Sequence, residues 1–230
     1  MKTIGLLGGM SWESTQTYYW LLNEHVKARL GGLHSAKLIL YSVDFAEIEA
    51  LQHQGNWAGT ADILSRAARA VEQAGAEFLV IGTNTMHKVA PEIEQASGIP
   101  LLHIADATGR VLKRDGVSNV GLLGTRFTME QDFYRERLEQ AGIRVIVPDE
   151  PEREMIHRVI YEELCQGAIN DSSKQAYLEI VAALAERGAE AVILGCTEIG
   201  LLIQQADTPV ALYDTTEIHA AQAVEKALDT

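Results

Sequence analysis

Apolar and polar positions follow two patterns along the chain, and each pattern is typical of one kind of secondary structure. Short apolar runs bounded by Gly, Pro, Asp or Ser are typical of strands buried on both faces of a parallel sheet. Strands are therefore predicted at Thr3–Leu7, Lys37–Tyr41, Phe78–Ile81, Leu101–Ile104, Asn119–Leu123, Arg144–Val147, Ala191–Leu194 and Val210–Tyr213. Longer amphipathic segments predict helices at Glu13–Arg29, Ala58–Ala74, Thr128–Ala141, Glu152–Gln166, Ser172–Arg187 and Thr215–Leu228. Such alternation predicts an α/β fold of parallel βαβ units.

Sequence landmarks of this α/β pattern occur twice, in the same order. They are a GLLG strand end, a strand and turn that begin with GAE, and a strand introduced by proline. The pairs are Ile4–Gly9 with Val120–Thr125, Gly75–His87 with Gly188–Gly200, and Gly98–Asp106 with Asp207–Asp214. Because all the pairs keep their order, they indicate an internal duplication of the chain.

The duplication predicts two similar parallel-sheet α/β lobes related by a pseudo-twofold axis. The first lobe is expected to comprise residues 1–103 and 214–230, and the second residues 104–213. Open α/β sheets bind ligands at the carboxyl ends of their strands. The active site is therefore expected in the cleft between the lobes, with residues 82–85 (GTNT) on one wall and 195–198 (GCTE) on the other.

The paired turns combine backbone and side-chain donors that suit an anionic ligand. Each turn follows a buried strand and precedes a predicted helix start, where free N–H groups carry the positive end of the helix dipole. Asn84, Thr85 and Thr197 add side-chain donors, so a carboxylate or phosphate needs no Lys or Arg here. The same field is expected to lower the pKa of the Cys196 thiol, which makes it a base or nucleophile.

A structural interpretation of these turns stands beside the functional one. Thr83 and Cys196 can be small residues tolerated at tight turns, while Asn84 and Thr197 cap helices. Capping does not require matched turns in both halves of a chain, so the duplication favours function.

The motifs GLLGGMS, TNTMH, LLGT and GCTE together resemble the aspartate/glutamate racemase superfamily, which contains the cofactor-independent amino-acid racemases. The resemblance covers nearly the whole chain. It implies two similar α/β lobes that face each other across a cleft, commonly in a dimer. It also implies that two cysteines flank the substrate Cα: one removes the α-proton as a thiolate and the other returns a proton to the opposite face. No pyridoxal phosphate or other cofactor is implied.

Carried over by position, the resemblance makes Cys196 one catalytic residue and Thr83 the other. The family usually has a cysteine at the place of Thr83, and a hydroxyl is a far weaker acid than a thiol. It can still donate or relay a proton with help from a neighbour or water. Three consequences are open: racemisation that is unequal in its two directions, slow racemisation, or one-sided chemistry as in the related single-cysteine arylmalonate decarboxylases. The intact run from Asn84 to His87 favours a racemase.

Further residues near the turns are candidates for substrate binding. Met10 and Ser11 follow the first glycine turn, and Thr125 holds the equivalent place in the second lobe, so each can contact a substrate carboxylate or amine. Glu198 can bind an α-ammonium group or position a base, or it can be a helix-terminal acid. His87 can tune the charge of its turn or bind carboxylate, and a buried or capping role is equally open.

Substrate specificity depends on two other places in the sequence. In the family a loop equivalent to residues 44–57 covers the active site, so Gln52 is expected to contact the distal end of the substrate; a solvated loop is the alternative. Acid-specific relatives carry a lysine near the position of Cys165, which this chain lacks. Aspartate, glutamate and a broader set of amino acids therefore all remain possible substrates. Cys165 itself is expected to pack in the core rather than to catalyse.

Charge and cysteine content exclude several other classes of protein. The net charge of −13 argues against nucleic acid or an anionic membrane as partner. The cysteines form no metal motif, so reduced thiols in a cytoplasmic protein are expected. No apolar stretch approaches the length of a membrane span, and the apolar run at the start is too short for a signal peptide.

The sequence thus predicts a cytoplasmic amino-acid racemase that needs no cofactor or metal and acts on a small-molecule amino acid. A homodimer is expected because aromatic residues 18–20 lie on the first helix and the loop at residues 32–36 reads as exposed. The alternatives are a single-cysteine decarboxylase or isomerase of the same superfamily, and a non-catalytic amino-acid-binding protein.

Overall fold

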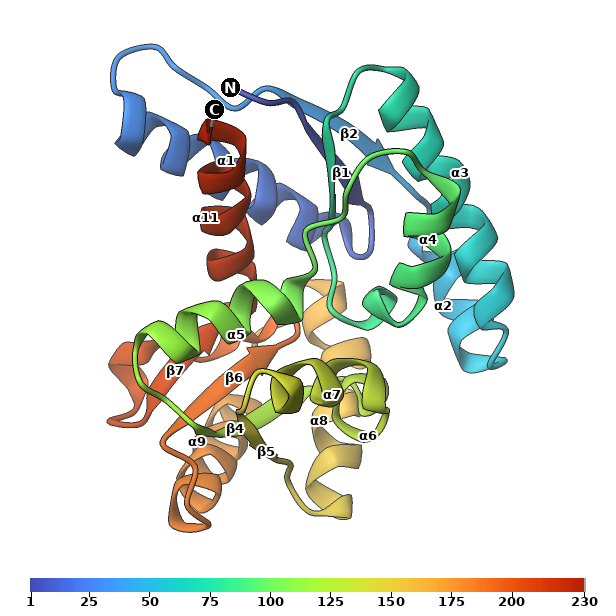
Figure 1. Cartoon of the computed structure of the whole chain (residues 1–230). Helices are drawn as coiled ribbons and strands as arrows, with labels where there is room; N and C mark the ends of the chain where they lie inside the picture. The colour runs from blue at the N-terminus through green and yellow to red at the C-terminus, as the bar shows by residue number, and fades with distance from the viewer. Residues whose placement is uncertain (230) are drawn as a thin grey trace. The chain divides into compact units, whose positions relative to one another are not determined.

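The computed structural model of the protein describes residues 1–229, and the chain forms two compact units. The first unit comprises Met1–Ile104 and the segment from His219 onward, and the second comprises Ala105–Ile218. The chain thus leaves the first unit after Ile104 and returns to it at His219. Each unit has its own parallel sheet with helices packed on it (Figure 1), which confirms the predicted α/β class.

The sheet of the first unit has the strand order β2-β1-β3, and both strand pairs are parallel. Its strands are β1 (Ile4–Gly8), β2 (Leu38–Ser42) and β3 (Phe78–Ile81). Its helices are α1 (Trp12–Leu30), α2 (Phe45–His53), α3 (Trp57–Gln73), the 3₁₀ helix η1 (Thr85–Val89) and α4 (Ala90–Ala96). Helices α5 (Ile104–Arg114) and α11 (Thr215–Leu228) span the two places where the chain passes between the units.

Helices cover both faces of this sheet (Figure 1). On one face, Leu6 of β1 lies in a core cluster with Leu22 of α1 and Val224 of α11. On the other face, Leu7 of β1 lies in a cluster with side chains of α3 and α4. Successive side chains of β1 therefore enter different cores, which explains why the strand reads as an unbroken apolar run.

The sheet of the second unit has the order β5-β4-β6-β7, again with parallel pairs. Its strands are β4 (Asn119–Gly124), β5 (Arg144–Ile146), β6 (Ala191–Gly195) and β7 (Ala211–Asp214). Its other helices are α6 (Arg126–Glu130), α7 (Asp132–Gln140), α8 (Glu150–Glu162), η2 (Leu164–Gln166), α9 (Asp171–Glu186), α10 (Ile199–Leu202) and η3 (Gln205–Asp207). Leu194 of β6 lies in a core cluster with Ile160 of α8 and Val181 of α9.

The two units share a strand order, in which the strand that ends in GLLG lies between its neighbours. In the first unit a single bridge from Leu101 to β3 occupies the place of β7. Both central strands also carry a glycine beneath a helix. A Cβ on Gly5 would lie 2.9 Å from Val71 of α3, and a Cβ on Gly121 would lie 2.9 Å from Leu184 of α9. The two units are thus also similar in how closely a helix approaches each sheet.

The predicted strand at Leu101–Ile104 is wrong beyond its single bridge. The Ile104 N–H donates to Nε2 of His87 at 3.2 Å instead of to a neighbouring strand, and α5 begins at that residue. A side chain from a distant segment thus takes the hydrogen bond that a sheet would use. Helix α5 itself was not predicted, and neither were α2, α4 and α10.

The predicted helix at Thr128–Ala141 is interrupted. Gln131 has an extended backbone with φ −94° and ψ 150°, and it ends α6 and begins α7. Asp132 lies in the first turn of α7, where a carboxylate interacts favourably with the helix dipole. The predicted helix at Glu152–Gln166 also ends early, at Glu162, and the 3₁₀ helix η2 follows it. The amphipathic pattern runs through both breaks because the segment on each side of a break buries apolar side chains.

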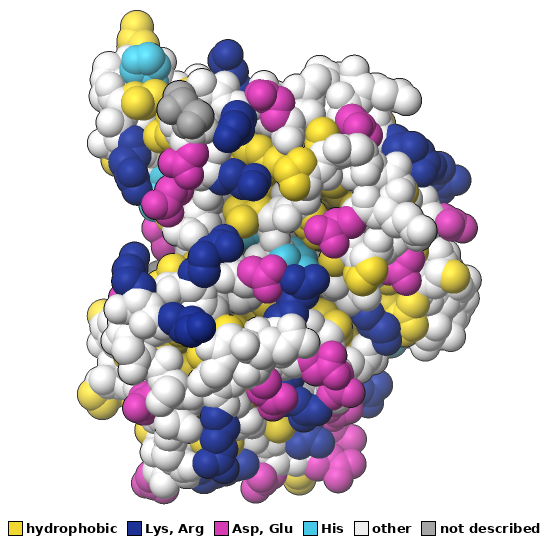
Figure 2. Space-filling model, in the orientation of Figure 1, with side chains coloured by type: hydrophobic (Ala, Val, Ile, Leu, Met, Phe, Trp, Pro, Cys, Tyr) yellow, Lys and Arg dark blue, Asp and Glu magenta, His cyan; other side chains and the backbone are white. Residues whose placement is uncertain are grey.

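The surface carries charges of both signs. On the face shown in Figure 2, Lys and Arg side chains are interspersed with Asp and Glu, so the net charge of −13 forms no single-sign patch there. Within residues 1–229, every helix is too short or too polar to span a membrane.

The turn after β1 gives the first testable prediction. Gly9 has φ +89°, and a Cβ built on it would lie 2.2 Å from the carbonyl oxygen of Val43. Gly55 has φ +69° but open space around its Cβ position. We expect Gly55→Ala to cost about 1 kcal/mol of unfolding free energy from backbone strain, and Gly9→Ala to cost about 3 kcal/mol because the clash adds to it. Urea denaturation measures both, and equal losses would contradict the clash.

Candidate active site

The first unit brings its two predicted turns together because β1 and β3 are parallel neighbours. The N–H of Gly82 donates to the carbonyl of Leu7 at 2.8 Å. The Ser14 hydroxyl reaches the carbonyls of Ser11 at 3.0 Å and Gly82 at 3.4 Å. The predicted residues that this unit supplies are Met10, Ser11, Gln52, Thr83, Asn84 and Thr85.

Met10 and Ser11 form the turn between β1 and α1. The Ser11 hydroxyl accepts a hydrogen bond from the N–H of Ser14 at 3.3 Å and caps α1. Met10 is buried in the same core cluster as Met86. Ser11 thus caps a helix that starts directly after the glycine turn, and a substrate contact by Met10 would have to use its backbone.

Thr83 is the accessible residue of its turn. Its side chain is partly exposed, whereas residues 84–87 are buried. Asn84 makes no side-chain cap at η1, so the capping interpretation of this residue is wrong. Thr83 is thus the one partly exposed residue of residues 82–87.

The buried His87 side chain hydrogen-bonds to the backbone of the Thr83 turn. Its Nδ1 lies 2.8 Å from the carbonyl oxygen of Thr83, and its Nε2 accepts the N–H of Ile104 at 3.2 Å. An acceptor at Nε2 leaves the proton of the neutral ring on Nδ1, which therefore donates to Thr83. Of the roles left open by the sequence, the buried and capping role is the one observed.

Gln52 does not lie on a loop, as the resemblance had suggested. Residues 45–53 form α2, and Asp44 caps it by accepting the N–H of Ala46 at 3.1 Å. Gln52 is buried, and its Nε2 lies 2.9 Å from Sδ of Met86. The solvated loop, which the sequence left open as the alternative, is therefore wrong, because a capping aspartate starts a helix that buries Ile48 and Gln52. A substrate contact by Gln52 stays a prediction.

The second unit repeats the arrangement with β4 and β6 as parallel neighbours. A Cβ on Gly124 would lie 2.9 Å from the carbonyl oxygen of Gly195, so the two turns that follow are close. Thr125 caps α6, because its hydroxyl accepts the N–H of Thr128 at 3.3 Å. The predicted residues that this unit supplies are Thr125, Cys196, Thr197 and Glu198.

Cys196 and Glu198 form a buried hydrogen-bonded pair. The thiol donates to Oε2 of Glu198 at 3.0 Å, and the Thr197 hydroxyl donates to the same oxygen at 2.7 Å. Glu198 is 2% exposed, and neither it nor Thr197 makes a side-chain cap at α10. The capping interpretation is therefore wrong for Thr197, and the Glu198 carboxylate accepts the protons of both neighbours.

The expectation that the turn lowers the pKa of Cys196 is wrong. Burial raises the pKa of this thiol well above its usual range, and the negative charge of Glu198 raises it further. Helix α10 comprises only Ile199–Leu202, so few aligned peptides contribute to an opposing dipole. In the resting protein Cys196 is therefore a thiol with its proton directed at a carboxylate.

Cys165 lies in η2 and packs, partly buried, against the core cluster that contains Cys196. It lies on no turn at a strand end, in agreement with the packing role expected from the sequence. Its proximity also contributes to the raised pKa of the Cys196 thiol.

Asp214 was not predicted as part of this site. It ends β7, next to β6, and its Oδ1 accepts the N–H of Thr216 at 2.8 Å. A Cβ built on Gly200 of α10 would lie 2.5 Å from its Oδ2, so this oxygen is close to the backbone of α10. Burial raises the pKa of Asp214. The sequence could have indicated Asp214 by its position, because it ends the proline-led segment that occurs in both halves of the chain.

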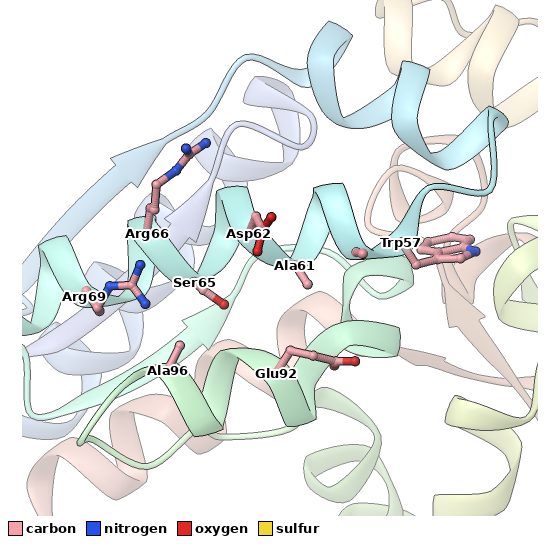
Figure 3. Close-up of a pocket in the computed structure, with 9 residues that line it drawn as sticks. Trp57, Ala61, Asp62, Ser65, Arg66, Arg69, Glu92 and Ala96 are labelled. Carbon is pink, nitrogen blue, oxygen red and sulfur yellow. The ribbon is translucent and has the colours of Figure 1, made fainter.

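A cavity of about 500 Å³ lies between α3 and α4, away from these turns. Figure 3 shows the small side chains of Ala61, Ser65 and Ala96 between the two helices, with Arg69 and Glu92 at its edges. None of the predicted site residues lines this groove. Small side chains on facing helices explain its volume, and it is not the candidate active site. Among residues 1–229 no cluster of His, Cys, Asp or Glu is arranged to bind a metal.

The sequence of residues 7–223 matches the family model of the Asp/Glu/Hydantoin racemases. The chain belongs to this family. The match covers both units and all the turns described above. Family membership supports an isomerase of the racemase type.

Relatives of the chain share its fold over their whole length. A Yersinia pestis protein, described as a candidate Asp/Glu racemase, is 57% identical, with a TM-score of 0.92 and 100% of both chains covered. An aspartate racemase homologue from Pyrococcus horikoshii is 37% identical, with a TM-score of 0.84 and the same coverage. The broad-specificity amino-acid racemase RacX of Bacillus subtilis is 22% identical over 98% of each chain.

The buried carboxylate beside Cys196 gives the second prediction. Glu198→Gln removes the negative charge that raises the pKa of the Cys196 thiol, so that pKa should fall although burial still keeps it high. Because only the thiolate is alkylated, iodoacetamide should react faster with this variant across pH 7–10, measured in a Cys165→Ala background.

Glu162→Gln serves as the control, because Glu162 is exposed on α8 of the same unit. It should leave the pH dependence of alkylation unchanged. Slower alkylation of Glu198→Gln than of the parent would show that the carboxylate favours the thiolate rather than the thiol.

Proposed function

We propose that the protein is an amino-acid racemase that works without pyridoxal phosphate and uses Cys196 and Thr83 as its two proton carriers. The observation that carries the proposal is the buried Cys196–Glu198 pair, with 3.0 Å between thiol sulfur and carboxylate oxygen. A carboxylate that accepts the thiol proton can remove it when the substrate arrives, and it can return it afterwards. Family membership supplies the reaction type.

The Cys196 turn performs proton transfer at one face of the substrate Cα. The thiol passes its proton to Glu198, and the thiolate then takes the α-proton, which forms the S–H bond again as the Cα–H bond breaks. In the reverse direction the thiol gives its proton to the carbanion. Backbone N–H groups of the turns, with Asn84, Thr85 and Thr197, stabilise the enolate-like charge.

Thr83 serves the opposite face in this proposal. The residue is partly exposed, so water can reach it and complete a proton relay. A hydroxyl holds its proton far more tightly than a thiol, so Thr83 delivers a proton more readily than it removes one. The two directions of the reaction should therefore differ in rate.

Substrate contacts are assigned to the residues around these turns. The α-carboxylate and α-ammonium groups are bound by Ser11, by Thr125, by the backbone at Met10 and by the donors of the turns. Glu198 positions the Cys196 base, which is the other role that the sequence left open for it. Gln52 contacts the substrate side chain, either directly or through Met86, whose sulfur it contacts. The relatives include an aspartate racemase homologue and a broad-specificity enzyme, which supports aspartate, glutamate or a wider set of amino acids.

One observation favours a second function, a decarboxylase or isomerase with a single cysteine. The Thr83 turn has no thiol, while Cys196 has a complete acid–base partner in Glu198. Such an enzyme would protonate a carbanion from one side only, after loss of carbon dioxide from a malonate. A non-catalytic amino-acid-binding protein would bind substrate without exchanging its α-proton.

Proton exchange at Cα tests the proposal. Wild-type protein and the variants Cys196→Ala and Thr83→Ala are incubated in D₂O with both enantiomers of aspartate, glutamate and several neutral amino acids. Cys196→Ala should lower exchange at least about 100-fold, and Thr83→Ala should abolish inversion more than exchange. NMR follows deuterium uptake and chiral chromatography follows inversion.

The outcomes separate the candidate functions. Exchange with inversion that both variants reduce supports the racemase. Exchange without inversion that depends only on Cys196 rejects Thr83 as a proton carrier. Absence of exchange with every amino acid rejects the racemase, and turnover of an arylmalonate would then support the decarboxylase. Tyr19→Phe, on the exposed face of α1, is the matched control.

We further propose that the protein is a cytoplasmic homodimer. Tyr18 is buried, but Trp12, Tyr19 and Trp20 of α1 are 65%, 57% and 59% exposed. Leu33, in the loop after α1, is fully exposed. An exposed aromatic face of this kind is typical of a protein interface.

The aromatic face of α1 predicts the oligomeric state. The double variant Trp12→Glu, Trp20→Glu should convert a dimer to a monomer, because unpaired charges cannot be buried at an interface. Light scattering after size-exclusion chromatography measures the mass. Leu201→Glu, at a residue 46% exposed in the second unit, is the control and should leave the mass unchanged. A wild-type monomer would refute the proposal.

A further inference from the structure

The first unit contains a buried cluster of aromatic polar side chains that the proposed chemistry does not use. His87, His103, His219 and Tyr18 are each at most 4% exposed. The ring centroids of His87 and His103 are 4.4 Å apart, and those of His87 and His219 are 5.8 Å apart. Burying polar rings costs free energy unless they are hydrogen-bonded, so their partners define what the cluster does.

The hydrogen bonds fix the tautomer of His219. Its Nε2 lies 2.8 Å from the carbonyl oxygen of Leu102, and a carbonyl can only accept, so Nε2 carries the proton. Its Nδ1 lies 2.8 Å from the Tyr18 hydroxyl, which therefore donates to it. His87 has the opposite tautomer, with its proton on Nδ1, because Nε2 accepts the N–H of Ile104.

These partners lie where the chain passes between the units. Leu102 and Ile104 belong to the segment that leaves the first unit, and His219 is the residue at which the chain returns. His219 joins the returning segment to the leaving segment through Leu102. His87 joins the leaving segment to the Thr83 carbonyl at 2.8 Å. A continuous set of contacts thus links both crossing points to the turn.

We infer that His87 is a positioning residue. It fixes the Thr83 turn relative to residues 102–104, where the chain leaves the first unit, and through them to His219, where the chain returns. The Thr83 carbonyl follows the end of β3 and precedes the first residue of η1, so no helix hydrogen bond orients it. The His87 ring supplies that bond with a rigid, buried group whose other nitrogen is fixed by Ile104. The catalytic use of Thr83 rests on the proposed function, whereas the positioning of its turn does not.

Two substitutions separate the bonds of His87. An Asn amide nitrogen can take the place of Nδ1 and donate to the Thr83 carbonyl, whereas a Gln amide reaches the place of Nε2 and leaves that carbonyl without its donor. One part of the α-proton exchange is lost in Thr83→Ala. His87→Gln should lower the kcat of that part about tenfold, with little change in KM. His87→Asn should lower it less than about threefold.

Amide hydrogen exchange of residues 82–88 gives a readout that does not depend on activity. The amides of this segment should exchange about tenfold faster in His87→Gln than in wild type, and His87→Asn should retain most of the protection. His53→Gln is the matched control, because Nδ1 of His53 also contacts the carbonyl four residues earlier, at 3.1 Å, but on an exposed helix end. It should change neither activity nor exchange at residues 82–88.

A wild-type measurement keeps the inference testable if either variant fails to fold. Nitrogen-15 NMR of the histidine rings should find His87 neutral with its proton on Nδ1 and His219 neutral with its proton on Nε2 at pH 7. A proton on Nε2 of His87, or equal loss of amide protection in His87→Gln and His87→Asn, would overturn the inference. If protection differs as expected while Thr83→Ala leaves exchange unaffected, His87 still positions the turn and only the catalytic role of Thr83 falls.

Discussion

Parallel pairing of the two GLLG strands with their neighbours is the constraint on which both turns depend. Parallel strands end on one edge of a sheet, so β1 and β3 place Ser11 beside the Thr83 turn, and β4 and β6 place Thr125 beside Cys196. Side chains at Gly124 or Gly195 would collide with the neighbouring strand's carbonyls at less than 3 Å. The glycines that make the motif recognisable are therefore those that let the turns come close.

Burial of the Cys196 turn in the second unit opposes the ionisation of the Cys196 thiol. A solvent-exposed cysteine would ionise more easily, but water would also compete for the substrate. The structure keeps the thiol protonated and places the Glu198 carboxylate at its hydrogen, so the sulfur becomes charged only when its proton is transferred. Thr197 donates to the same oxygen and shares in stabilising the buried charge.

Much of the fold follows from the sequence because unbroken apolar runs identify strands buried on both faces. The chemistry of the turns follows only in part. Neither the hydrogen bond from Ile104 to His87 nor the raised pKa of Cys196 is visible in a local pattern, because each depends on a partner or on burial that only tertiary structure creates. For the same reason α2 was not predicted: only the tertiary structure buries Ile48 and Gln52, and Gln52 contacts Met86 of η1.

The return of the chain at His219 also orders events during synthesis. The ribosome completes the whole second unit before it makes the part of α11 that belongs to the first. Until then Tyr18 lacks its histidine partner, and the core on that face of the β1 sheet lacks Ala220, Ala223 and Val224. Domains fold as units when their chain is complete, so the second unit can fold first although it was begun later. The first unit can therefore complete its core only after the whole second unit has been synthesised.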